Sequence, residues 1–204
     1  CGKTRAVIEL LSQHWGFYFN ASSDDWGSAD MMTLRSVVQK YLNDRRDSSD
    51  IDLEANNGYA RKTTLLLFLS RLIIFKRCLN VPGSSESLTS ARWTLLQVCP
   101  HVLFEQNFFN MLFLQLLHLR HYRETDLWDF VRSMYEDTKG CLIEHGCLPR
   151  IKSNTRLLVI HDEAQVLGDE FSGSFHRQPQ QSPHDHFFLL FYMRFETLAS
   201  TFSH

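Results

Sequence analysis

Two adjacent carboxylates follow a short apolar run near the far end of the chain. Residues 157–160 (Leu-Leu-Val-Ile) are too few for a helix and rich in strand formers, and Asp162 and Glu163 come just after them. Open α/β sheets keep their ligands at the carboxyl ends of their strands. We therefore expect a buried strand that presents Asp162 and Glu163 to a metal ion and a water molecule. The alternative is a buried strand that simply runs into a capped turn.

The other end of the chain offers residues that suit a phosphate group. Cys1 is followed by Gly2, Lys3 and Thr4, which match the last three positions of a phosphate-binding loop. A glycine lets backbone N–H groups point at phosphate oxygens, a lysine reaches the β- and γ-phosphates, and a threonine hydroxyl coordinates Mg²⁺. A helix that begins here would also direct its positive end at the anion. Arg5 is a further candidate for nucleotide contact, with a solvent-facing position as the alternative.

Taken together and in this order, the two motifs resemble those of P-loop NTPases that carry an additional catalytic glutamate, close to the AAA+ and STAND ATPases. The run Asp-Glu-Ala-Gln at 162–165 is similar to the end of their Walker B strand. The resemblance implies binding and Mg²⁺-dependent hydrolysis of a nucleoside triphosphate, ATP in the first instance or GTP. In these roles Thr4 and Asp162 hold Mg²⁺, and Glu163 activates the attacking water as general base.

A narrower resemblance rests on four stretches: Gly-Lys-Thr-Arg at 2–5, the aromatic segment 15–19, the loop 25–28 and His-Asp-Glu-Ala-Gln-Val-Leu-Gly at 161–168. Together they are similar to the NTPase region of Crinkler-type proteins of oomycetes and soil-dwelling fungi. This likeness implies an NTPase module that precedes a nuclease-like or kinase-like effector domain. The partners it implies are a nucleotide, and a protein partner or that effector domain.

The elements that must position these residues follow from local pattern. We expect a helix over 3–14, an aromatic strand over 17–20 and an acidic loop over 21–30. Helical periodicity then continues through 32–42, 62–79, 90–98, 103–121 and 125–139, with a charged segment at 43–58. Residues 168–186 are rich in Ser, Gln, Gly and Pro and are expected to form a flexible loop.

These expectations define the fold class as α/β. The resemblance to P-loop NTPases implies that the chain is one partial P-loop NTPase domain over 1–204, a parallel-sheet core lacking its first strand. The long separation of the two motifs is assigned to a large helical insertion over 31–146. Because the sequence begins at Cys1 inside the phosphate loop, we interpret it as a fragment.

Composition limits the other functional classes. The 204 residues are 44% hydrophobic and 22% charged, which excludes wholesale disorder. A net charge of -2 gives no support to nucleic-acid binding, and the most apolar stretch is interrupted too often for a membrane span. Five scattered cysteines are unlike a disulfide framework. This cysteine usage is of the intracellular type, which fits the cytoplasm or the nucleus, but the sequence leaves the location unknown, and any secretion signal would lie upstream of Cys1.

A rival hypothesis belongs to another class. Because only the end of the phosphate loop is present, the chain is alternatively a catalytically inactive NTPase remnant that acts as a helical protein-interaction module.

Overall fold

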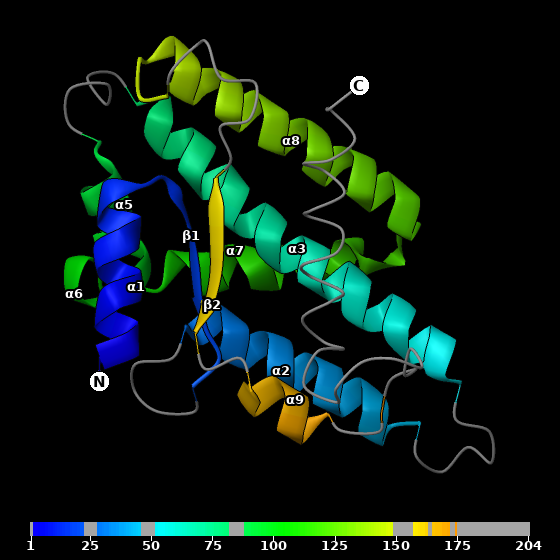
Figure 1. The fold of residues 1–204 in the computed structure, drawn as a ribbon. Coiled ribbons are helices and arrows are strands. Elements are labelled where there is room, and N and C mark those ends of the chain that lie inside the picture. The colour runs from blue at the N-terminus through cyan, green and yellow to red at the C-terminus, as the bar shows by residue number, and fades with distance from the viewer. Residues whose placement is uncertain are drawn as a thin grey trace, which may run out of the picture.

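The structure is a computed structural model that describes residues 2–22, 28–45, 52–81, 88–148, 157–162, 165–171 and 174. Its helices and strands, in chain order, are α1 (Gly2–Gln13), β1 (Gly16–Asn20), α2 (Ala29–Asn43), α3 (Leu53–Leu79), α5 (Ser90–Val98), α6 (Pro100–Leu103), α7 (Phe108–Leu116), the 3-10 helix η1 (Leu117–His121), α8 (Glu124–Glu144), β2 (Leu158–Asp162) and α9 (Gln165–Glu170). Figure 1 shows one long helix, α3, crossing the middle of the molecule, with the other helices and the small sheet around it.

Helix α3 forms the centre of the fold because it is apolar on nearly every side. It is capped at its start by Asp52, whose side chain accepts a hydrogen bond from the backbone of Ala55. Most residues from Thr63 to Leu72 are fully buried, and the helix packs against α2, α7, η1 and α8. A helix without a polar face can lie only in an interior, which explains its position.

The aromatic side chains of the core join α3 to the sheet and to α5. Phe17 of β1 meets Phe68 and Phe75 edge-on at ring distances of 4.9 and 5.7 Å, and Phe75 stacks on Trp93 at 4.3 Å. All four side chains are completely buried. Burial of one such side chain contributes about 1.5–3 kcal/mol, so this cluster fixes β1 firmly against α3.

The two strands are parallel neighbours, with Gly16 opposite Leu158 and Asn20 opposite Asp162. The outer edge of β1 is covered by side chains of α5 instead of a third strand. Trp93 donates its indole N–H to the carbonyl of Gly16 at 2.7 Å, and the Gln97 side chain accepts the N–H of Tyr18 at 3.0 Å. These bonds satisfy backbone groups that a further strand would otherwise pair.

The expected fold class is wrong. A parallel-sheet NTPase core with a helical insertion was predicted, but 74% of the described residues are helical and the sheet has only two strands. The physical reason lies in the distribution of apolar residues. The long apolar runs between the two motifs have helical periodicity, and they assemble their own core around α3 instead of covering a wide sheet.

Several element boundaries also differ from expectation. The start of α3 lies at Leu53, nine residues before the predicted start at 62. Polar residues such as Asn56 and Asn57 led to the prediction of a charged segment there, but in the structure they are buried within the first turns of the helix. The segment predicted as one helix over 103–121 instead holds α7 and η1, while the short helix α6 ends where the segment begins, and α9 was not predicted. The predicted flexible loop 168–186 lies largely outside the described residues.

Gly16 is the glycine whose lack of a side chain matters most. A Cβ there would lie 2.4 Å from the carbonyl oxygen of Leu158 and 2.8 Å from a methyl group of Leu11, whereas a Cβ at Gly140 in α8 would meet nothing within 4 Å. We expect Gly16→Ala to destabilise the protein by about 1–3 kcal/mol through overpacking. Gly140→Ala, the matched control, should stabilise it by about 0.5–1 kcal/mol. Urea unfolding followed by circular dichroism measures both, and equal effects would contradict the close packing of α1 on the sheet.

Candidate functional site

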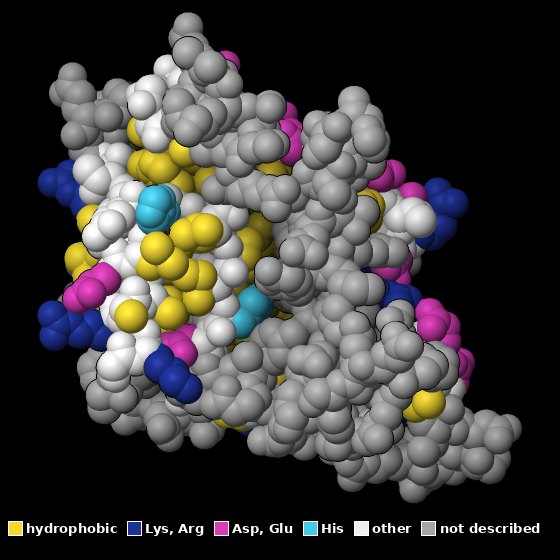
Figure 2. Space-filling view, viewed as in Figure 1, with side chains coloured by type: hydrophobic (Ala, Val, Ile, Leu, Met, Phe, Trp, Pro, Cys, Tyr) yellow, Lys and Arg dark blue, Asp and Glu magenta, His cyan; other side chains and the backbone are white. Residues whose placement is uncertain are grey.

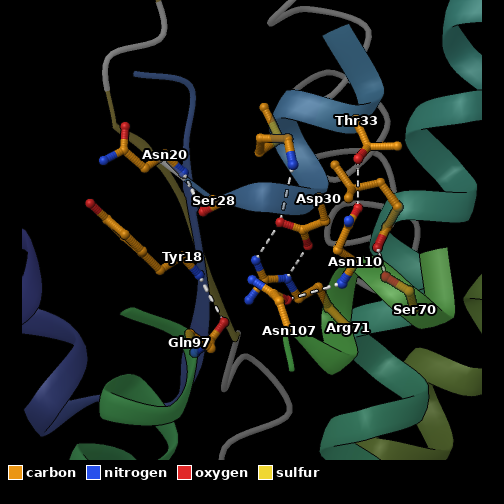
Figure 3. Close-up of polar contacts among 12 residues, drawn as sticks. Tyr18, Asn20, Ser28, Asp30, Thr33, Ser70, Arg71, Gln97, Asn107 and Asn110 are labelled. Carbon is orange, nitrogen blue, oxygen red and sulfur yellow. Dashed lines mark hydrogen bonds and ion pairs between the residues drawn. The ribbon is translucent and has the colours of Figure 1, made fainter. Parts of the chain in front are cut away.

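One face of the sheet is turned toward α1. Gly16 identifies this face, because the Cβ it lacks would touch Leu11 of α1. Side chains alternate along a strand, so Tyr18 and Asn20 share the face with Gly16. Asp162 lies opposite Asn20 in the register of the two strands, so its side chain lies on this face as well. Figure 3 shows Tyr18 and Asn20 pointing away from the α3 side of the sheet.

Asp162 ends β2 on this face and is 9% exposed. Its Oδ2 accepts a hydrogen bond from the hydroxyl of Tyr18 at 3.0 Å, across the two strands. Tyr18 is itself held in place by Gln97, which bonds its backbone N–H. The sequence-predicted carboxylate is therefore a buried side chain at the carboxyl end of a parallel strand whose other residues, 158–161, are half-buried, and a tyrosine orients it.

The first turn of α1 contains the predicted phosphate-binding residues. Gly2 and Lys3 are exposed, and Thr4 is half-buried. Arg5 is exposed and forms an ion pair with Glu9 one turn further along, with Nε and Oε1 2.8 Å apart. Arg5 therefore faces solvent, as the alternative expects, and a nucleotide contact by this residue stays a prediction.

Helix α1 runs antiparallel to both strands. The backbone N–H of Leu158, where β2 begins, donates to the carbonyl of Trp15, just beyond the carboxyl end of α1. Twelve helical residues span about 18 Å and five strand residues about 17 Å. The amino-terminal turn of α1 consequently lies toward the edge where both strands end, as Figure 1 shows.

The sequence-predicted residues are thus brought together in part. Gly2, Lys3 and Thr4 lie toward the same end of the sheet as Asp162, and α1 covers the face on which the Asp162 side chain lies. Glu163, the predicted general base, lies outside the described residues, as does Cys1. Within the described part of the chain, no group of three or more His, Cys, Asp and Glu side chains is arranged to hold a metal ion.

Sequence reasoning missed the residues that support Asp162. Tyr18 was interpreted only as part of an aromatic strand, and Gln97 only fell within the helix expected over 90–98. Their contacts join positions 79 and 144 residues apart. A tyrosine that alternates with phenylalanines along a strand was the one available signal, because its hydroxyl needs a partner when the strand is buried.

A second polar group was also missed, in the interior behind the sheet. Asp30 of α2 and Arg71 of α3 form two hydrogen bonds, at 2.7 and 2.8 Å, and neither side chain is more than 1% exposed. The guanidinium also lies 3.9 Å from the ring centre of Phe109. Asp30 had been assigned to a polar loop. The signal for such a pair was Arg71, the one charged residue between Thr63 and Phe75 in an otherwise uncharged stretch of α3, since a buried charge requires a partner.

His161 provides a pH-dependent contribution to stability. Its ring stacks on Phe19 at a centroid distance of 5.2 Å, and burial lowers its pKa from 6.5 to about 3. Between these values the unfolded chain binds a proton at His161 and the folded chain does not, so stability decreases as the pH falls below about 6.5. At pH 5 the loss is about 2 kcal/mol.

We expect His161→Gln to remove this part of the pH dependence. Urea unfolding at pH 7.5 and pH 5 should show that the wild-type chain loses about 2 kcal/mol more than the variant on acidification. Identical losses for the two proteins would mean that His161 is protonated in the folded state at pH 5.

Comparisons with protein-family models, with curated proteins and with solved structures found no match to this chain. None of the helices in the described ranges is long and apolar enough to cross a membrane. The site's geometry is therefore the basis for a functional proposal.

Proposed function

We propose that this chain binds a nucleoside triphosphate, ATP or GTP, together with Mg²⁺, and hydrolyses it. The site lies where the first turn of α1 approaches the carboxyl edge of the two-stranded sheet. The observation that supports the proposal most is the orientation of α1, whose first turn, with Lys3 and Thr4, lies toward the end of the sheet where Asp162 ends β2. These residues come from opposite ends of the sequence but lie toward one edge, on the side of the sheet that α1 covers.

The chemistry of the site supports an anion accompanied by a cation. The start of α1 supplies backbone N–H groups without partners inside the helix, and its dipole favours a negative charge. Lys3 adds a positive charge on an exposed side chain. No acidic residue lies in the first turn of α1 to compete with a phosphate.

The residues present fit Mg²⁺ when it arrives with a nucleotide. Mg²⁺ prefers oxygen ligands and retains several waters, and in phosphate-transfer sites it uses one or two protein oxygens with the substrate phosphates. The Thr4 hydroxyl and the Asp162 carboxylate are two such groups. Tyr18 donates to Oδ2 of Asp162 and thereby holds the carboxylate in one orientation.

Each residue then has a distinct task. Bound Mg²⁺ neutralises charge on the β- and γ-phosphates. Lys3 and the backbone of the first turn of α1 hold the triphosphate, Thr4 and Asp162 hold the cation, and Glu163 accepts a proton from the water that attacks the γ-phosphorus.

Calorimetric titration of the chain with ATP, with and without Mg²⁺, tests this proposal. We expect saturable binding of one ATP per chain that is markedly weaker when Mg²⁺ is removed with a chelator. Absence of binding under both conditions would remove the NTPase function from consideration.

A second candidate function is a helical protein-interaction module. It is favoured by large apolar side chains that lie about half exposed, among them Leu95, Leu114 and Phe130 at 51%, 51% and 49%. Figure 2 shows further hydrophobic side chains on the face where α1 and β2 lie. Leu10 of α1 is itself 44% exposed. The ATP titration separates the two candidates, because a module that only binds proteins has no need of Mg²⁺-dependent ATP binding.

A further inference from the structure

A cavity of about 750 Å³ lies between the second half of α2 and the first half of α3. Arg120 and His121 of η1 form another part of its wall. Figure 1 shows α1 on the opposite side of the molecule from this part of α2 and α3, so the cavity is separate from the proposed nucleotide site. We call it the α2–α3 pocket. Its volume is in the range of small-molecule sites, about 300–1,000 Å³.

The lining of the α2–α3 pocket is strongly cationic. Among the described residues of the lining, Lys40, Lys62 and Arg120 are cationic and Asp44 is the one carboxylate. No ion pair found among the described residues includes Lys40 or Lys62. A concentration of positive charge in a hollow attracts anions, because the low-dielectric walls focus the field. The chain as a whole has a net charge of -2, so this pocket contrasts with the rest of the surface.

Two tyrosines give the pocket an aromatic wall and further hydrogen-bond donors. Tyr41 and Tyr59 stack face to face at a centroid distance of 3.8 Å and an angle of 5°. Burial raises the pKa of Tyr59, although the nearby Arg120 acts in the opposite direction. The Tyr59 phenol is therefore protonated at neutral pH and is a donor. Val37 and Ala55 complete the wall with apolar surface.

We propose that the α2–α3 pocket binds a phosphomonoester whose organic part is apolar or aromatic. A phosphate dianion offers three acceptor oxygens, which match the ammonium, guanidinium and phenol donors of Lys40, Arg120 and Tyr59. A carboxylate needs fewer cations than the pocket supplies. The volume remaining beside a phosphate group accommodates an organic part against Tyr41 and Val37.

The shape of the site distinguishes a small ligand from nucleic acid. Proteins that bind single strands use a positively charged groove that follows the backbone over several nucleotides, with bases stacked on exposed rings. Here the cations surround one hollow, and the facing surfaces of Tyr41 and Tyr59 are occupied by each other. Arg45 also lies 4.9 Å from the centre of the Tyr41 ring.

Phenyl phosphate is a suitable probe, with calorimetry and NMR titration of the intact chain as readouts. We expect saturable binding that the double variant Lys40→Met/Lys62→Met weakens by about tenfold or more. Arg77→Met removes an exposed cation elsewhere on α3 and should leave the affinity unchanged. Because Lys62 is half-buried, Lys40→Glu provides a second variant at an exposed position and should also weaken binding.

Three results would overturn the proposal. The first is no saturable binding of phenyl phosphate to the folded wild-type chain. The second is equal or tighter binding of benzoate, which would assign the pocket to carboxylates. The third is loss of phenyl phosphate binding in Lys3→Met but not in the Lys40 variants, which would place the anion at α1. None of these results depends on whether ATP binds at α1.

Discussion

Replacing Asp30 with alanine should destabilise the protein by about 3–5 kcal/mol, the largest effect we expect from a single side chain. The substitution leaves the Arg71 guanidinium buried at 1% exposure without its carboxylate partner. Folded domains are stable by only about 5–15 kcal/mol. Urea unfolding should consequently show a large decrease in the midpoint, or a chain that is already partly unfolded in buffer.

Two controls separate loss of the ion pair from loss of packing. Asp137→Ala removes another carboxylate that pairs with α3, since its Oδ2 lies 2.9 Å from Nζ of Lys76. The Asp137 side chain is 57% exposed, however. It should cost less than about 1 kcal/mol. The double variant Asp30→Leu/Arg71→Met removes both buried charges and should recover most of the lost stability. If Asp30→Ala costs no more than Asp137→Ala, the buried pair does not hold α2 against α3.

The second large effect is expected for Glu163→Gln. As a general base, Glu163 should contribute about 10²–10⁴-fold to the hydrolysis rate. The amide cannot accept the proton of the attacking water, but it leaves in place the contacts to phosphate and Mg²⁺ that we propose for Lys3, Thr4 and Asp162. We therefore expect a variant that retains bound ATP and fails to turn it over.

Phosphate release and ATP retention on a desalting column measure these two properties separately. Glu170→Gln is a matched control, since Glu170 pairs with Arg35 at 2.6 Å and not with any residue of the site. Continued hydrolysis by Glu163→Gln, or loss of ATP affinity along with the activity, would contradict the proposed role.

Local pattern was sufficient to predict much of the secondary structure. Hydrophobic periodicity and the residues that start or stop a helix predicted three elements: the helix after Thr4, the strand after Gly16 and the helix at Ser90–Val98. The observed bounds of each lie within a few residues of the predicted ones. The two strands do pair in parallel, but in a two-stranded sheet and not in the parallel-sheet core that was predicted. Asp162 was correctly expected at the carboxyl end of a strand.

What could not be predicted depends on contacts between distant positions. Tyr18 meets Asp162 across 144 residues, and Arg71 meets Asp30 across 41 residues. Helical periodicity also says nothing of what a helix packs against. The apolar runs were assigned to an insertion on a sheet, whereas α3 forms the centre of a helical fold. The pocket between α2 and α3 depends on the same tertiary packing and had no signal in the sequence.

Binding of ATP to single-residue variants tests the central claim most directly, because the claim is that both ends of the chain form one site. Calorimetric titration with ATP and Mg²⁺ should show that Lys3→Met and Asp162→Asn each weaken binding, with Arg77→Met unchanged. Their combined effect should differ from the sum of the separate effects, as expected for residues that share a ligand. Affinity that is unchanged in both variants, or absent in the wild-type chain, would contradict the account.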